Sequence, residues 1–420
     1  MKQDTPTPLQ EADDSGFAVR VTQSAKSVAA KVLPVSSGAT ALLFGVVMFL
    51  VTFGMVMVFA ASSVDSVRSE QNILSVVFRQ GLFTFFGIPL MLIAARVKEG
   101  FYRRVAVWGV LLGIALQCLV FTPLGDEYGG NRNWIRFGDF VSIQPSEFVK
   151  LALAVWIGFV LSRKGGRVRE FIPAWIPVAP VAILAIGLVM LGRDFGTVVI
   201  MVALVFGAMF IAGVKIRHLL APLIVVSVVA VPIVLSSPSR VRRIQHFFDG
   251  CTEAEYYAGC WQQLHGTWAM SGGGVLGVGL GNSRAKWNWL PEADSDYIFA
   301  IIAEELGMIG AITVLLLYAV MTYAFIRIIR EAQSPFTKIV TGAVMVWIVG
   351  QAFVNIAVVL GLLPVLGVPL PLVSAGGSQT LATLLAIGVV LALARSDRQS
   401  SQDGEAPEDV RLAVRAEGRA

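Results

Sequence analysis

Apolar segments about 20 residues long, enough to cross the roughly 30 Å of hydrocarbon in a bilayer, recur along nearly the whole of this chain. The sequence of 420 residues is 56% hydrophobic and only 15% charged, a balance that the core of a water-soluble domain does not need. Because the runs are spread along the chain rather than confined to its start, a removable secretion signal does not explain them. The sequence therefore predicts an all-α protein that crosses a membrane many times.

About ten spans are expected, in one membrane domain over residues 39–395. The expected spans are 39–60, 77–95, 104–123, 147–162, 171–192, 196–213, 218–236, 297–326, 338–360 and 371–395. The polar tails at 1–38 and 396–420 lack hydrophobic periodicity, and we expect both to be disordered. A large polar loop, 237–296, separates the seventh and eighth spans.

Basic residues give this topology its direction, because short loops rich in Lys and Arg stay in the cytoplasm. With both termini in the cytoplasm, the inner loops hold Arg96, Lys98, Arg103, Arg104, Arg163, Lys164, Arg167, Arg169, Lys215, Arg217, Arg327, Arg330 and Lys338. The net charge of +5 is thus dispersed among loops of a cytoplasmic-membrane protein, not gathered into a nucleic-acid-binding stripe. The long loops 124–146 and 237–296 then face outside, and we expect function there.

Three carboxylates precede the eighth span in the segment 290–296. Asp296 is the candidate general base, because burial at the membrane surface and the charge of Asp294 would raise its proton affinity. Glu292 is a candidate substrate contact. The alternative is structural: Ser295 or Asp296 caps the helix, whose dipole favours acidic neighbours. The sequence leaves both interpretations open.

Four charged residues are expected inside the bundle. Glu304 lies eight residues beyond Asp296, or about 12 Å deeper along a helix, where an unpaired charge is costly. Its candidate partners are Lys150, one turn after Glu147, and the pair Arg193-Asp194. A buried ion-pair network that supports the bundle explains Glu147, Lys150, Asp194 and Glu304 as well as a functional site does.

Two clusters of external arginines are candidate phosphate ligands. Arg132 and Arg136 flank Trp134, which alone could be an interfacial anchor. The second cluster, Arg240, Arg242 and Arg243, precedes a glycine-rich stretch whose amides could cradle phosphate or simply form a flexible loop.

A proline-rich segment, 362–378, interrupts the helices before the last span. Its three prolines and the pair Gly376-Gly377 prevent a continuous helix, so its backbone must be satisfied by protein or by a wet cavity. Ser374, Gly376 and Gly377 are therefore candidates for lining a site, and a structural loop is the equal alternative.

These segments together resemble the SEDS glycosyltransferases, the shape, elongation, division and sporulation family, over roughly residues 40–395. The motifs occur in family order: Gly130 to Ile135 with Gln144 to Glu147, Asp194 to Thr197, Leu290 to Glu292, and Leu370 to Ser378. Residues 57–63 and 361–365 look more like the cell-division branch than the elongation branch.

The resemblance implies that Asp296 is the family's essential aspartate and Trp134 its external tryptophan. It implies an inverting polymerase that joins lipid II units at the outer face of the bacterial cytoplasmic membrane, with arginines binding the diphosphate. It also implies a class B penicillin-binding protein transpeptidase and other division proteins as partners, alongside membrane lipids. No dedicated metal-ligand cluster is present, so any Mg or Mn ion would be held largely by the substrate diphosphate.

The chain departs from the family pattern in four places. Many relatives have His-Thr-Asp-Phe where this chain has 294–297, so a negative charge is added beside the proposed base. The usual Pro-Asp is Arg193-Asp194, and the usual Ser-Tyr is Ser374-Ala375. Cys251 and Cys260 are an unusual pair in the large loop, where an oxidising environment permits the disulfide that we expect.

Two other functions remain open at this stage. A lipid II flippase could use Lys150, Asp194 and Glu304 to line a path, although the distinctive residues crowd the outer face only. The other is a scaffold that recruits a transpeptidase and division proteins, and this role is compatible with catalysis. The polymerase itself could serve elongation rather than division.

Overall fold

The computed structural model describes residues 37–403, apart from 69–73, 129, 139–140, 251–255, 257–259 and 288. Residues 1–36 and 404–420 of the predicted tails lie outside the described residues. The last helix runs to Gln402, beyond the end near residue 395 that the sequence predicted.

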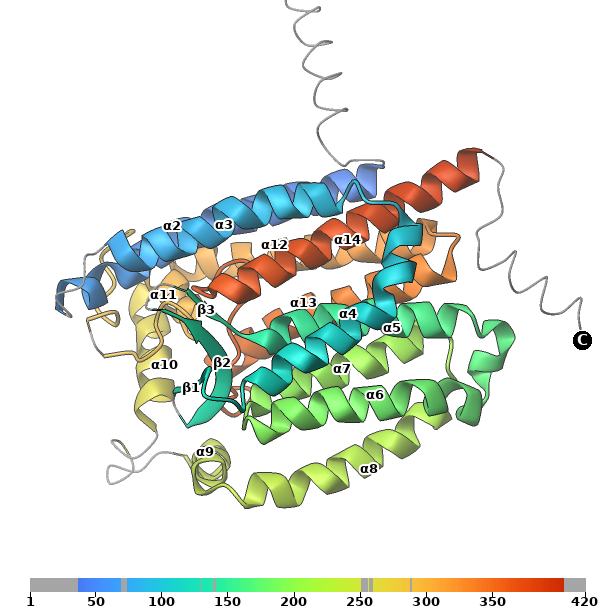
Figure 1. Cartoon of the computed structure of the whole chain (residues 1–420). Coiled ribbons are helices and arrows are strands. Elements are labelled where there is room, and N and C mark those ends of the chain that lie inside the picture. Colours follow the sequence, from blue (N-terminus) through green and yellow to red (C-terminus); the bar gives the residue numbers. More distant parts are fainter. Residues whose placement is uncertain are drawn as a thin grey trace, which may run out of the picture.

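In the part of the chain that the structure describes, ten apolar helices form a bundle, whose arrangement is shown in Figure 1. They are α2 (Gly38–Arg68), α3 (Leu74–Ala94), α4 (Glu99–Leu119), α5 (Pro145–Ser162), α6 (Phe171–Leu191), α7 (Phe195–Ile211), α8 (Ile216–Leu235), α12 (Gly307–Glu331), α13 (Pro335–Val359) and α14 (Gly377–Gln402). Within the described residues, eight of these are long and apolar enough to cross a membrane, and the apolar helices Gln80–Ala94 and Phe195–Ile211 are shorter. The all-α polytopic class is confirmed.

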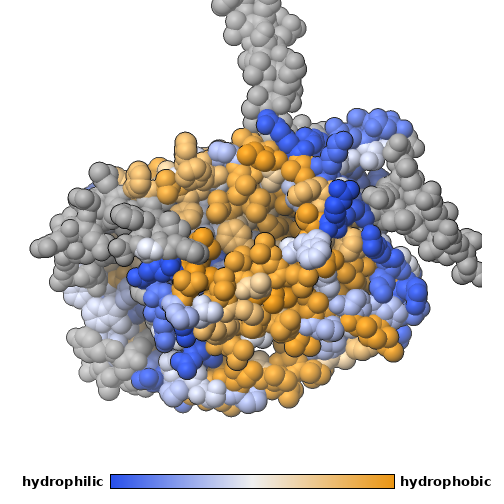
Figure 2. Space-filling view, viewed as in Figure 1, coloured by the Kyte–Doolittle hydropathy of each residue, from blue (hydrophilic) through white to orange (hydrophobic). Residues whose placement is uncertain are grey.

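The bundle is layered by helices that pack in pairs. Helix α3 packs on α14, α4 on α5, and α13 on both α5 and α7, while α8 lies at the edge of the bundle (Figure 1). Glycines allow the closest approach: a Cβ at Gly388 of α14 would lie 2.5 Å from the carbonyl of Met91. Small residues of this kind bring membrane helices together where no water drives association. Figure 2 shows apolar side chains over the middle of the visible face and hydrophilic ones toward its ends.

Nearly all remaining elements gather at one end of the bundle, which we call the loop end (Figure 1). They are β1 (Gly125–Tyr128), β2 (Asn131–Phe137), β3 (Val141–Ile143), α9 (Pro238–Asp249), α10 (Trp261–Gly273) and α11 (Ile298–Glu305). The strands form an antiparallel sheet in the order β1-β2-β3, which the sequence analysis did not anticipate. The opposite end carries short connections and the 3-10 helix η1 (Gly165–Arg169).

The expected eighth span, 297–326, is in fact two helices. Helix α11 ends at Glu305, and α12 begins at Gly307, which has a φ of 68° that favours glycine. The glycine-rich loop passes against this break, where the amides of Val278 and Gly279 donate to the carbonyls of Glu304 and Glu305, both at 3.0 Å. A Cβ at Gly307 would lie 2.4 Å from the amide nitrogen of Gly277, so the break and the glycine-rich loop require each other.

A buried ion pair locks this loop to the break. The ammonium of Lys286 lies 3.2 Å from the carboxylate of Glu305, and both side chains are almost fully buried. The same ammonium donates to the carbonyls of Ala60 at 3.1 Å and Gly281 at 2.6 Å. Burial is tolerated because the charge is paired and its remaining protons are bound.

We expect Lys286→Ala to lower the free energy of unfolding by about 3–5 kcal/mol, because it leaves the carboxylate of Glu305 buried without its cation. Denaturant unfolding of the detergent-solubilised protein measures the change. The matched control is Arg327→Ala, which removes an exposed pair with Glu331 at 2.9 Å and should cost at most about 1 kcal/mol. Equal losses in the two variants would contradict the prediction.

Candidate active site

Asp296 lies at the loop end, directly before α11. The chain reaches it through a tight turn in which Glu292 has a φ of 53° and its carbonyl accepts from the amides of Ser295 at 3.3 Å and Tyr297 at 3.0 Å. The N-cap of α11 is Tyr297, and no side chain caps the helix. The structural alternative, in which Ser295 or Asp296 serves as the cap, is therefore wrong, and the carboxylate of Asp296 is not used in capping.

The backbone around Asp296 is held by the segment between α13 and α14, residues 360–376, which we call the crossing segment. The side-chain amide of Asn355 donates to the carbonyls of Asp296 and Val368, both at 2.7 Å. The hydroxyl of Ser374 donates to the carbonyl of Ser295 at 2.6 Å, and the amide of Ala375 to that of Asp294 at 2.8 Å. The predicted interruption of the last span is confirmed, with α14 beginning at Gly377 rather than near 371.

Gly367 brings the crossing segment close to the carboxylate itself. Its φ is 69°, and a Cβ there would lie 3.5 Å from Oδ2 of Asp296. A glycine is favoured at this φ, and its missing side chain leaves the carboxylate uncovered.

The surroundings of Asp296 favour its protonated form. The side chain keeps partial solvent exposure, yet densely packed protein surrounds it. This desolvation, followed by the negative charge of Glu292, raises the pKa of Asp296 from 3.8 to about 7, and Asp194 and Asp294 act in the same direction. The positive charge of Arg243 opposes the rise. A carboxylate with a pKa near neutral is suited to accept a proton at physiological pH.

Three arginines form a positive cluster beside this carboxylate. Arg240 and Arg243 are three residues apart and share a face of α9, whereas Arg242 lies off that face. The guanidinium of Arg240 donates to the carbonyl of Arg193 at 2.8 Å. Desolvation and the charges of Arg243 and Arg193 lower the pKa of Arg240, as expected where cations crowd together. Arg193 was expected only as part of a possible partner pair for Glu304, not as a member of this cluster. Its φ of 63° is unusual for a residue other than glycine.

Asp194 is a hub that joins the sheet to the bundle. It caps α7 by accepting from the amide of Thr197 at 3.1 Å. Its other oxygen accepts from the side-chain amides of Asn133 on β2 at 2.9 Å and Gln144 at 2.8 Å. Asp194 thus fixes the position of the sheet relative to α7, and its charge also acts on Asp296.

Two other charged residues inside the bundle, Lys150 and Glu147, are linked to the crossing segment by hydrogen bonds. Lys150 pairs with Glu147 at 2.8 Å and donates to Gln351 at 3.1 Å, and Gln351 donates in turn to the carbonyl of Pro369 in the crossing segment at 3.0 Å. Glu304 does not pair with Lys150 or with Arg193-Asp194, so both predicted partners are wrong.

Glu304 instead binds the loop that precedes the site. It accepts from the hydroxyl of Ser283 at 2.5 Å and from the amide of Arg284 at 2.8 Å. Backbone amides satisfy a buried carboxylate as well as a cation does, and that arrangement has no sequence signature.

The candidate residues on the sheet contact other residues of the sheet and the chain just before it. Arg136 pairs with Asp126 at 2.5 Å, and Arg132 donates to the carbonyl of Thr122 at 2.8 Å. Trp134 lies on β2 opposite Asp126 and is half-buried. A ligand role for Arg132, Arg136 or Trp134 stays a prediction.

The pair Gly376-Gly377, where the crossing segment meets α14, is a packing feature. A Cβ at Gly377 would lie 2.3 Å from the ring of Phe83, and one at Gly376 would lie 2.8 Å from the side chain of Gln379. Their proposed role in binding substrate stays a prediction.

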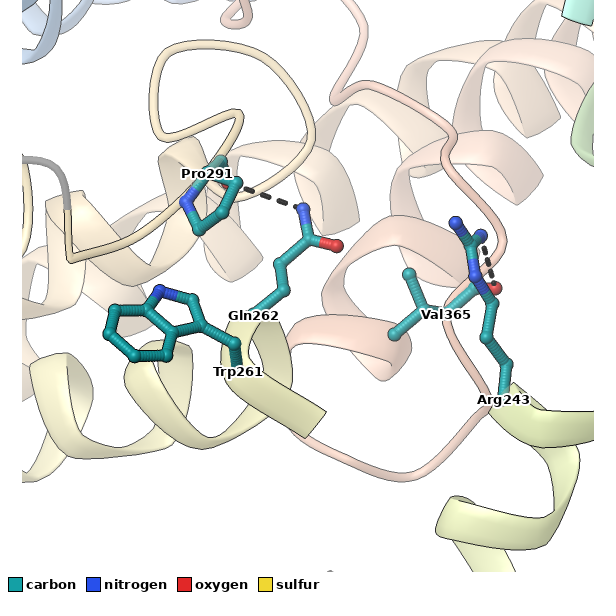
Figure 3. A pocket seen from close by; sticks show the side chains of 5 residues that line it. All are labelled: Arg243, Trp261, Gln262, Pro291 and Val365. Carbon is teal, nitrogen blue, oxygen red and sulfur yellow. Dashed lines mark hydrogen bonds between the residues drawn. The ribbon is translucent and has the colours of Figure 1, made fainter. Parts of the chain in front are cut away.

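A cavity of about 270 Å³ opens at the loop end, and Figure 3 shows the side chains that line it. It is lined by Arg243, Trp261, Gln262, Pro291 and Val365. These residues come from α9, α10, the turn before Asp296 and the crossing segment. Of the five, only Arg243 was a candidate site residue from the sequence, although Pro291 and Val365 lie in the segments 290–296 and 362–378 that were singled out there. Trp261 and Gln262 were missed because nothing in the sequence places α10 beside the crossing segment.

Two further expectations concern sulfur and metal. Cys260 is disulfide-bonded, but Cys251 lies outside the described residues, so the pairing of the two stays a prediction. Within the described part of the chain, no three His, Cys, Asp or Glu side chains gather as metal ligands. A divalent cation bound with the substrate diphosphate stays a prediction.

The fold and the site define a multi-span integral membrane protein with a carboxylate of raised pKa and a cluster of cations at one end. A family model described as "Cell cycle protein", FtsW/RodA/SpoVE, matches residues 40–399, and the chain belongs to this family. The resemblance to the SEDS family is thereby confirmed.

Curated relatives and a solved structure agree with this assignment. The chain is 36% identical over 360 residues to the probable peptidoglycan glycosyltransferase FtsW of Mycobacterium tuberculosis, covering 86% of this chain and 68% of the relative. It is 35% identical to the stage V sporulation protein E of Bacillus subtilis, covering 85% and 97%. A chain of a peptidoglycan synthase complex, studied for its coordination of polymerisation and crosslinking, has the same fold, with a TM-score of 0.71, 24% identity and coverage of 85% and 98%.

We expect Ser374→Ala to lower the free energy of unfolding by about 1–3 kcal/mol, because it removes a buried hydroxyl that joins two segments. That hydroxyl accepts from the amide of Leu370 at 2.8 Å while it donates to Ser295. Denaturant unfolding in detergent measures the loss. The control is Ser271→Ala, whose exposed hydroxyl donates only within its own helix, to Trp268. If both serines tolerate alanine equally, the crossing segment is held in some other way.

Proposed function

We propose that this protein is a peptidoglycan glycosyltransferase that polymerises lipid II into glycan strands for septal synthesis in cell division. Family membership and the FtsW relatives support the activity and the division role. The observation that carries the chemistry is the position of Asp296 beside the arginine cluster. Its pKa is about 7.

The reaction proposed is displacement at a sugar carbon. Asp296 removes the proton from the 4-hydroxyl of the acceptor sugar while that oxygen attacks the anomeric carbon of the growing strand. A new carbon–oxygen bond forms, the bond to the diphosphate breaks, and the anomeric configuration inverts. The proton stays on Asp296 until it is released to solvent, which partial exposure of the side chain allows.

The leaving group in this scheme is undecaprenyl diphosphate. Negative charge builds on its bridging oxygen as the bond breaks, so preorganised cations lower the barrier. Arg240 and Arg243 on α9, with Arg193, are the groups that we propose bind it, since all three lie within electrostatic reach of one another. Arg243 belongs to this cluster and also acts electrostatically on Asp296.

The proposed orientation places the loop end outside the cytoplasmic membrane. The basic connections predicted to be cytoplasmic, including η1 and the turn before α13, lie at the opposite end of the bundle (Figure 1). A class B penicillin-binding protein is the proposed partner, in keeping with the fold shared with a chain of a peptidoglycan synthase complex.

We expect Asp296→Asn to reduce polymerisation of lipid II in detergent by about 10²–10⁴-fold, because the amide cannot accept the proton. Gel analysis of glycan strands measures the rate, and size-exclusion chromatography verifies the fold. The matched control is Glu170→Gln, an exposed carboxylate at the opposite end, which should retain wild-type activity. Full polymerisation by Asp296→Asn would defeat the assignment and favour a flippase or scaffold.

We expect kcat/KM to fall on the acidic side of pH 7, by about tenfold per pH unit, because only the deprotonated form of Asp296 is active. Glu292→Gln removes a negative charge that raises the pKa of Asp296, so the midpoint of this limb should move to lower pH. Rate profiles from pH 5 to 9 test both statements. Glu331→Gln, exposed in its pair with Arg327, should leave the midpoint unchanged. An upward shift in Glu292→Gln would refute the electrostatic account.

A further inference from the structure

The cavity lined by Pro291 and Val365 has apolar walls, which the binding of a diphosphate does not require. Trp261, Pro291 and Val365 give it apolar walls, while Gln262 and Arg243 supply its polar groups. Small-molecule sites are built in this way, with apolar and aromatic linings and a few directed polar groups. Of the three clustered arginines, Arg243 lines the cavity, and in Figure 3 Gln262 lies between it and the ring of Trp261.

Trp261 is held as part of a stack of rings. His265 stacks on it with centroids 4.4 Å apart, and Trp289 lies nearly parallel to it, at 6° and 5.8 Å. The hydroxyl of Tyr256 lies 2.8 Å from Nε2 of His265. Burial lowers the pKa of His265 below 6.5, so the imidazole is neutral at neutral pH and stacks as an uncharged ring. The indole of Trp261 is therefore fixed before any ligand arrives.

The polar groups are also directed by the fold. The side-chain amide of Gln262 donates to the carbonyl of Pro291 at 3.2 Å, which orients its oxygen. Arg243 donates to the carbonyl of Val365 at 3.4 Å on the other side of the cavity (Figure 3). An amide and a guanidinium can bind hydroxyl and acetamido groups, and a flat aromatic ring suits the C–H face of a sugar.

We propose that this cavity is a sugar subsite in which Trp261 stacks on a ring of the acceptor disaccharide, with Gln262 and Arg243 binding its polar substituents. The inference rests on the proposed function, because it names the part of that substrate which the cavity holds. Val365 in the cavity wall lies two residues before Gly367, which approaches the carboxylate of Asp296. Two residues span at most about 7 Å, so a sugar held in the cavity lies near the base.

Steady-state kinetics of the full-length protein give the first test. Trp261→Ala should raise the KM for lipid II about tenfold with little change in kcat, and Trp261→Phe, which keeps an aromatic face, should restore most of the affinity. Gln262→Leu keeps the volume of the side chain but removes the amide, and should also raise KM. The matched control is Trp287→Ala, an exposed tryptophan that does not line the cavity, which should keep the wild-type KM.

Binding without turnover gives the second test. Saturation-transfer NMR with a lipid-free peptidoglycan tetrasaccharide should show binding to Asp296→Asn protein, and that binding should be lost when Trp261→Ala is added but kept with Trp287→Ala. An unchanged KM together with retained sugar binding in Trp261→Ala would overturn the proposal. The proposal would also be overturned if Trp261→Ala weakened the binding of inorganic diphosphate but left sugar binding intact, because the cavity would then be a diphosphate site. If the wild type binds the sugar through Trp261 but makes no glycan, the polymerase assignment fails and the subsite stands.

Discussion

The site depends on a short set of hydrogen bonds that tie residues 294–296 to the crossing segment. Asn355 joins Asp296 to Val368, Ser374 joins Ser295 to Leu370, and the amide of Ala375 reaches Asp294. Backbone groups in a non-helical stretch at membrane depth must find partners in protein or water. The proline-rich sequence that breaks the last span therefore makes these groups available, and the turn before α11 satisfies them. The same hydrogen bonds that stabilise the irregular backbone also fix the position of Asp296.

Electrostatics at the loop end are a balance between two opposing requirements. A proton-accepting carboxylate needs burial and negative neighbours, whereas a departing diphosphate needs cations. Glu292 and Asp194 raise the pKa of Asp296, while Arg240 on α9 donates to the carbonyl of Arg193 in the turn between α6 and α7, an arrangement that fits both proposed roles. Arg243 acts on both groups and lowers the pKa that the others raise. The positive charge of Arg243 therefore limits the rise, so that the pKa of Asp296 is about 7 and not higher.

Most of the fold was predictable because hydrophobic run length and loop charge are local properties of a sequence. Within the described residues, apolar helices occur in the expected chain order, and the prolines of 362–378 predicted the break before the last span. The catalytic role of Asp296 stays a prediction. The break at Gly307 was not, since it exists only because the glycine-rich loop packs there. Glu304 was given the wrong partners because backbone amides leave no trace in a sequence. Arg193, Trp261 and Gln262 were missed for a related reason: their importance arises from segments that meet only in the folded chain.

The walls of the site come from residues 238–249, 261–273, 290–296 and 360–376, which the ribosome makes at widely separated times. Contacts between such distant segments form late, since they must wait for the intervening chain. The crossing segment is the last of the four to be synthesised, and without it Ser295 lacks its bond from Ser374 and Asp296 lacks its neighbour Gly367. Nascent chains that do not yet include this segment therefore contain no assembled site.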